Sequence, residues 1–147
     1  MTAPGVVPAP VKTFVDTNIL VYAHDTSAGS RHATAKGILT GLWDSRAGVL
    51  STQVLQEFYA VATRELQPVM PRGQARAIVA AYGEWCDAPT EPQLVVAASR
   101  LEEKRTVAFW DALIIEAALR AGARRLLSED LQDGRRFGPL VIENPFR

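Results

Sequence analysis

The stretch Lys12-Thr-Phe-Val-Asp-Thr-Asn18 decides the fold class, because a short strand signal runs straight into a polar turn. The apolar run Ile19–Ala23 follows at once and predicts a short helix. The same order, a short β-branched or Leu-rich strand followed by a helix, recurs along the chain. We therefore predict an α/β fold with a mostly parallel sheet, in which ligands bind beyond the carboxyl ends of the strands.

The remaining sequence supplies the other elements of this fold. Further strands are predicted at 48–51, 125–128 and 139–142, and helices at 31–44, 52–66, 71–85, 92–104 and 109–121. No linker divides the chain, so we expect a single domain over 11–147. The uncharged, Pro-rich start, 1–10, is expected to be a flexible leader.

Composition narrows the class of protein. The single cysteine, Cys86, excludes an internal disulfide and a cysteine-based metal site. No apolar stretch reaches the roughly 18 residues that span a bilayer, and the first residues lack the features of a signal peptide, so we predict a cytoplasmic protein. The formal net charge of zero neither favours nor excludes a nucleic-acid partner. Trp43, Trp85 and Trp110 are expected to be core or interface residues.

Two acidic positions directly follow predicted strands. Asp16 follows the first strand directly, and Asp130 follows the third predicted strand, within Ser128-Glu129-Asp130. Each also has a structural alternative, because Asp16 suits a helix N-cap and Asp130 suits a polar turn. Glu129 and Asp133 compete with Asp130 for the position beyond that strand.

Two further acidic residues lie within predicted helices. Asp111 stands roughly opposite Glu116 and Arg120, so its carboxylate falls on the buried face, which is costly without a partner, a proton or a metal. The alternative role, interaction with the helix dipole, explains its place in the first turn but not its face. Glu57 lies at the edge of an apolar stripe, where an isolated glutamate is usually a boundary residue that reaches water.

This set of side chains offers oxygen ligands for a metal. The two histidines, His24 and His32, match no zinc spacing, whereas carboxylates suit Mg²⁺ or Mn²⁺. Carboxylates brought together repel one another unless a cation neutralises them. A bound divalent ion also acidifies water and stabilises charge on a phosphoryl oxygen. An acidic site at strand ends therefore predicts phosphodiester hydrolysis.

The candidate residues lie in segments that occur in a characteristic order. These segments are Phe14-Val-Asp-Thr-Asn-Ile-Leu-Val-Tyr-Ala23, Thr52-Gln-Val-Leu-Gln-Glu-Phe-Tyr59, Phe109-Trp-Asp-Ala-Leu-Ile-Ile115, Leu127-Ser-Glu-Asp-Leu-Gln-Asp-Gly134 and Ile142-Glu-Asn-Pro-Phe146. Together they resemble PIN-domain ribonucleases, most closely the VapC-type toxins of bacterial toxin–antitoxin pairs, and the resemblance runs from about Val11 to the C-terminus.

The resemblance implies a five-stranded parallel sheet flanked by helices, and metal-dependent endonucleolytic cleavage of RNA. It further implies a dimer, and a small antitoxin whose tail covers the site. The family's acidic positions match Asp16, Glu57, Asp111 and Asp130, and the polar positions that support the first aspartate match Thr17 and Asn18.

Three other functions are compatible with parts of the pattern. A phosphatase of the haloacid dehalogenase type also starts with an aspartate after its first strand, but it needs a second aspartate where this chain has Asn18. A metal-dependent DNase could use the same acidic site. A catalytically inactive PIN-fold interaction module would be marked by lost acidic positions, and all four are filled here.

Overall fold

The computed structural model describes residues 10–87 and 89–147, so the expected leader, 1–10, lies outside the described residues except for its last residue. One five-stranded sheet has the strand order β2-β1-β3-β5-β4. The strands are β1 (Thr13–Val15), β2 (Gly48–Val49), β3 (Arg125–Leu127), β4 (Arg136–Phe137) and β5 (Leu140–Glu143). All neighbours pair in parallel except β4, which runs antiparallel to β5 at the edge. The predicted α/β fold with a mostly parallel, five-stranded sheet is confirmed.

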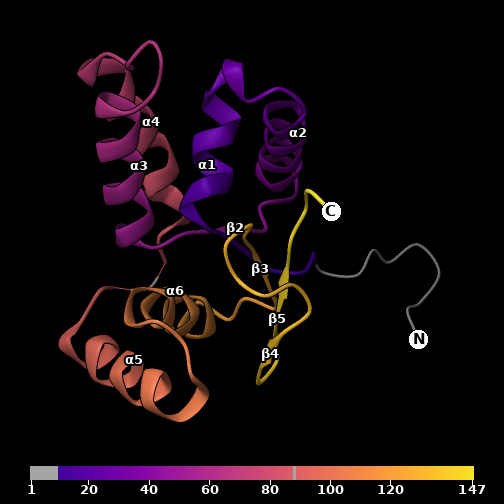
Figure 1. The fold of residues 1–147 in the computed structure, drawn as a ribbon, viewed down its shortest axis with the longest axis vertical. Helices are drawn as coiled ribbons and strands as arrows, with labels where there is room; N and C mark the ends of the chain where they lie inside the picture. The colour runs from indigo at the N-terminus through magenta and orange to yellow at the C-terminus, as the bar shows by residue number, and fades with distance from the viewer. Residues whose placement is uncertain (1–9, 88) are drawn as a thin grey trace.

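Six α-helices of the described chain flank this sheet. They are α1 (Thr17–His24), α2 (Ser30–Ser45), α3 (Thr52–Arg64), α4 (Arg72–Tyr82), α5 (Pro92–Arg105) and α6 (Phe109–Arg120). In Figure 1, α1 to α4 stand together in the upper half, and α5 and α6 lie below the beginning of α3. None of the helices in the described ranges has the length and apolarity needed to cross a membrane.

The central strand β1 fixes where the polar turns meet. Phe14 and Val15 have no exposed surface, and β1 is hydrogen-bonded to β2 on one side and β3 on the other. The register pairs Val15 with Leu127, so the residues that follow these two strands, Asp16 and Ser128, come to lie side by side. The Asp16 backbone N–H donates to the Leu127 carbonyl at 2.9 Å, which extends the pairing one residue beyond β1.

An aromatic cluster joins α2, α4 and the edge strand β2. The rings of Trp43 and Trp85 are 4.7 Å apart, and Tyr82 contacts both, at 5.3 and 5.0 Å. The Trp85 ring lies directly over Gly48 in β2, where an added Cβ would approach it to 2.5 Å. Trp85 is thus a core residue, whereas Trp110 is 68 % exposed, so of the two roles expected for it only the interface role remains a prediction.

We predict that Gly48→Ala destabilises the protein by about 1–3 kcal/mol, because the new methyl group overpacks the Trp85 ring. Urea unfolding measures this change. Gly41→Ala is the matched control: Gly41 lies inside α2, and a Cβ added there would meet nothing within 4 Å, so alanine should leave stability unchanged or raise it by about 0.5–1 kcal/mol. Wild-type stability in Gly48→Ala would contradict this packing.

Candidate active site

Asp16 is a buried carboxylate at the carboxyl end of β1, with 8 % of its surface exposed. The Thr17 N–H donates to Oδ1 at 2.8 Å, and the Ser128 hydroxyl donates to Oδ2 at 2.7 Å. Burial raises the pKa of Asp16 to about 6, although both hydrogen bonds oppose the rise; the charges of Asp130 and Glu57 add to it. Asp16 is also the N-cap of α1, so its structural role is confirmed, and its functional role stays a prediction.

Asp130 is tied to Asp16 through the short segment after β3. Its backbone N–H donates to Ser128 Oγ at 3.1 Å, and the same hydroxyl donates to Asp16. The Asn18 amide donates to Asp130 Oδ2 at 3.0 Å. The start of α1 and the segment after β3 are therefore held together by side chains from both, and the carboxylate of Asp130 stays exposed.

Glu129 and Asp133, the two alternatives to Asp130 as a candidate metal ligand, are bound to other side chains and backbone groups. Glu129 accepts a hydrogen bond from the Tyr22 hydroxyl at 2.6 Å and pairs with Arg31 at 2.5 Å. Burial alone would raise the pKa of Glu129, but these two partners outweigh it and lower the pKa. Asp133 accepts from the Asn144 N–H at 2.7 Å and pairs with the chain's last residue. Of the three, Asp130 is the one whose charge raises the pKa values of other candidate site residues.

Glu57 and Asp111 approach from α3 and α6. Glu57 is exposed and accepts hydrogen bonds from Gln53 Nε2 at 2.9 Å and from the Thr17 hydroxyl at 3.4 Å. Asp111 is half-buried in the first turn of α6. Burial raises its pKa, and the charges of Asp130 and Glu57 raise it further. The structure therefore agrees with the prediction that burial disfavours the charged form of Asp111.

The four carboxylates share one electrostatic neighbourhood, because Asp130 and Glu57 each raise the pKa values of both Asp16 and Asp111. They come from the end of β1, from α3, from α6 and from the segment after β3. Across the described residues, no three His, Cys, Asp or Glu side chains are close enough to form a ready-made metal site. The donors nevertheless fit a hard divalent cation, since all are oxygens and their mutual repulsion favours a positive charge between them.

Two residues of this neighbourhood were not predicted from the sequence. Ser128 bridges Asp16 and Asp130, and Gln53 holds Glu57. The spacing of four between Gln53 and Glu57 is a helical signal that could have identified the pair. Ser128 could have been found only with the register of β1 against β3 in hand.

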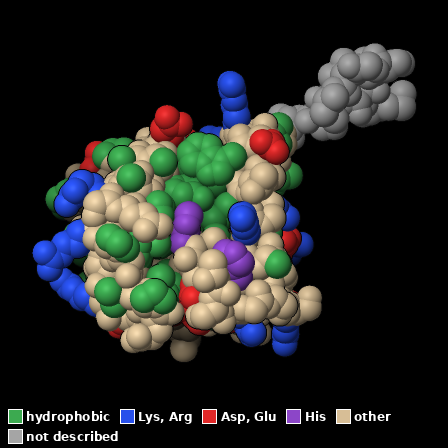
Figure 2. Space-filling view, turned by 90° about the horizontal axis from the view of Figure 1, so that it is seen from above, with side chains coloured by type: hydrophobic (Ala, Val, Ile, Leu, Met, Phe, Trp, Pro, Cys, Tyr) green, Lys and Arg blue, Asp and Glu red, His purple; other side chains and the backbone are tan. Residues whose placement is uncertain are grey.

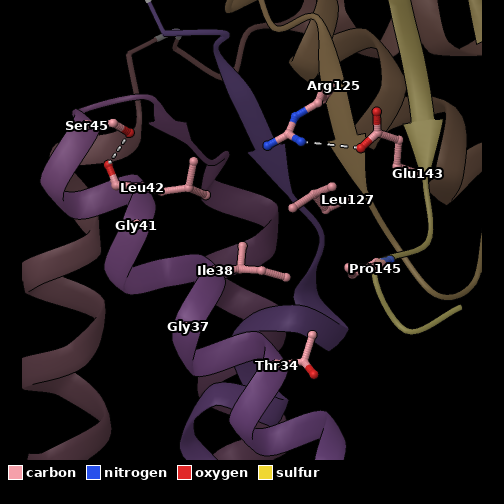
Figure 3. Close-up of a pocket in the computed structure, with 10 residues that line it drawn as sticks. All are labelled: Thr34, Gly37, Ile38, Gly41, Leu42, Ser45, Arg125, Leu127, Glu143 and Pro145. Atoms are coloured by element: carbon pink, nitrogen blue, oxygen red, sulfur yellow. Dashed lines mark hydrogen bonds and ion pairs between the residues drawn. The ribbon is translucent and has the colours of Figure 1, made fainter.

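Two cavities of the structure lie apart from the four candidate carboxylates. His24 and His32 line a cavity of about 370 Å³ beside the rings of Trp43 and Tyr82. Figure 2 shows the two histidines next to a hydrophobic patch on one face. A cavity of about 500 Å³ lies between α2 and the strands β3 and β5, where the ion pair between Arg125 and Glu143 forms part of its wall (Figure 3). Neither is lined by any of the four carboxylates.

Comparison with known proteins agrees with this fold. A chain of the VapBC2 complex from Rickettsia felis, solved bound to a DNA fragment from the promoter, has a similar fold with a TM-score of 0.56. The likeness covers 90 % of this chain and 97 % of that one at 18 % sequence identity. A comparison with curated protein sequences finds no match.

The PIN domain family model matches residues 13–133. This range contains all four candidate carboxylates, together with Thr17, Asn18 and Ser128, and it covers most of the chain. The chain therefore belongs to the PIN-domain family.

Proposed function

We propose that this PIN domain is a divalent-metal-dependent endoribonuclease and acts as the toxin of a toxin–antitoxin pair. PIN domains are generally nucleases, and the family match supports hydrolysis of a phosphodiester. The observation that carries the proposal is the shared electrostatic neighbourhood of the four carboxylates, which are held by four separate segments. A metal-dependent DNase and an inactive interaction module are the outcomes that an assay must separate from it.

In this proposal Asp16, Glu57, Asp111 and Asp130 hold Mg²⁺ or Mn²⁺. The bound ion supplies an acidified water and stabilises negative charge on the phosphoryl group. The protein's own contribution is to orient its ligands: Ser128 and the Thr17 N–H fix both oxygens of Asp16, and the Asn18 amide fixes Asp130. Gln53 and the Thr17 hydroxyl do the same for Glu57.

The toxin role and a homodimer rest on the family resemblance and on the likeness in fold to a chain of a VapBC complex. A cytoplasmic location remains a prediction from the sequence. Chemistry supports the antitoxin as partner, because a cluster of carboxylates attracts Arg or Lys, and Arg binds them bidentately. The phosphatase alternative has no support from the family match.

We predict that RNA cleavage requires Mg²⁺ or Mn²⁺, is lost on chelation and returns when the ion is restored. Asp111→Asn and Asp130→Asn should each lower cleavage at least about 100-fold, because each removes a charged ligand. The matched control is Glu129→Gln, next to Asp130 but paired with Arg31 and Tyr22, which should retain activity within a few-fold. Full cleavage activity in excess chelator would contradict the proposed metal dependence.

The pKa of Asp16 predicts how the metal-free protein responds to pH. Its folded pKa, about 6, lies above the ordinary aspartate value of 3.8, so the contribution of Asp16 to the free energy of unfolding falls as pH rises between these values and stays low above them. Asp16→Asn removes this loss, and at pH 7.5 with chelator it should be more stable than wild type by up to about 3 kcal/mol. At pH 3.5 the two should be nearly equal. Urea unfolding at both pH values checks this, and a mutant less stable than wild type at pH 7.5 would refute it.

The toxin role predicts a partner that brings a basic side chain to the carboxylates. Co-expression with the neighbouring gene followed by pull-down should recover a complex, with a segment of the partner that orders on binding. Asp111→Asn should weaken this complex, whereas Asp133→Asn should not, since Asp133 is paired at the C-terminus. A chain always recovered alone, and harmless when overexpressed, would count against the toxin role.

A further inference from the structure

Trp110 is an exposed aromatic residue next to Asp111, one of the four candidate carboxylates. With 68 % of its surface exposed, it is more exposed than Val11, Val69, Val95 or Val96, the other large apolar residues at the surface of the described chain. It directly precedes Asp111 in the first turn of α6. A tryptophan in this position leaves a flat apolar face open to a ligand at the edge of the proposed active site.

Trp110 lines a cavity of about 270 Å³ between α3, α5 and α6. The start of α3 lies directly above α6 in Figure 1. The apolar lining comes from Trp110, Leu94, Val95, Leu113 and Ala117, and the polar lining from Ser51, Thr52, Gln53, Gln56 and Thr90. No Lys, Arg, Asp or Glu is among these lining residues, so the cavity suits an uncharged ligand with an apolar face and polar edges.

Ser51 belongs to the lining of this cavity at the start of α3. The residue is 7 % exposed, and its hydroxyl is buried without a hydrogen-bond partner among the described residues. Because this hydroxyl has almost no accessible surface, the polar contacts to a ligand would come from the other polar side chains of the lining, Thr52, Gln53, Gln56 and Thr90. Ser51 is the residue before α3, yet its side chain makes no capping bond there.

Gln53 connects the cavity to the carboxylates. Its amide Nε2 donates to Glu57 Oε1 at 2.9 Å and to the Trp110 carbonyl at 3.4 Å, and the same residue lines the cavity. A group held against Trp110 would therefore sit next to a residue that positions a proposed metal ligand. A nucleotide adjacent to the cleaved bond would occupy this place.

We propose that the cavity beside Trp110 holds one unpaired base of the RNA substrate, stacked on the indole and bonded at its edge by the side-chain amides of Gln53 and Gln56 in α3. An unpaired base has the flat apolar face and the neutral polar edges that the lining requires, and aromatic stacking is the usual mode of single-strand recognition. The inference rests on the proposed ribonuclease function and adds to it one contact, between Trp110 and a base next to the cleaved bond.

The first experiment measures binding of a fluorescent single-stranded RNA by anisotropy, in the inactive Asp111→Asn protein. Adding Trp110→Ala should weaken binding between about five-fold and about 100-fold, as loss of one stacked base does, and Trp110→Phe should recover most of it. The salt dependence should stay the same, because no phosphate contact is removed. The matched control is Val96→Ala, also exposed and apolar on α5 but not part of the cavity lining, which should leave binding unchanged.

The second experiment moves a single abasic nucleotide along the RNA. One position next to the cleaved bond should weaken binding to the protein with Trp110, and the same position should have no effect once Trp110 is alanine. Fully base-paired RNA of the same sequence should be insensitive to Trp110→Ala.

The inference is overturned if Trp110→Ala binds single-stranded RNA as tightly as its parent at an unchanged melting temperature. It is also overturned if light scattering shows that Trp110→Ala only separates a dimer, because the cavity would then serve self-association. Metal-dependent RNA cleavage by wild type with a KM unaffected by Trp110→Ala refutes the base site and leaves the proposed function intact. A wild-type protein that neither binds nor cleaves RNA refutes both.

Discussion

The burial of Asp16 at the carboxyl end of β1 is the constraint on which the site depends. A carboxylate with 8 % of its surface exposed is costly in its charged form, and two donors, Ser128 and the Thr17 N–H, offset part of that cost. Both donors are in place only because β1 and β3 pair with Val15 opposite Leu127 and because α1 begins immediately after Asp16. A slip of one residue in that register would remove the Ser128 hydroxyl from the site.

The repulsion among the candidate carboxylates would favour both partners proposed for the protein, the divalent cation and the antitoxin. Asp16 and Asp111 both have raised pKa values, and in each case Asp130 and Glu57 contribute to the rise. A divalent cation relieves this repulsion, and so does a basic side chain from another protein. The metal and an antitoxin would therefore compete for one place. Glu129, already neutralised by Arg31, needs neither.

How far the sequence predicts this structure depends on how local each signal is. The fold class, β1 and the positions of Asp16 and Asp111 follow from strand ends and helix periodicity, and the structure agrees with them. The edge strand β4 was not predicted, because its two residues carry no pattern and owe their conformation to the hairpin with β5 at Gly138, where φ is +58°. The sequence could not separate Asp130 from Glu129 and Asp133 as the candidate metal ligand. In the structure Arg31 pairs with Glu129 and Arg147 pairs with Asp133, and both are contacts between residues far apart in the sequence or set by the fold.

The charge balance of the chain bears on how it would hold RNA. With 16 basic and 16 acidic residues, the protein has no net positive charge to attract a phosphate backbone, and the proposed catalytic centre repels it. Such a protein depends more than a basic one does on neutral contacts to the bases. Trp110 lies next to Asp111 in the first turn of α6, and side-chain amides from α3 line the same cavity. Stacking of a base on this exposed indole is uncharged and therefore remains favourable next to a negative site. The metal and the stacked base would thus make complementary contributions, one to the phosphate and the other to the base beside it.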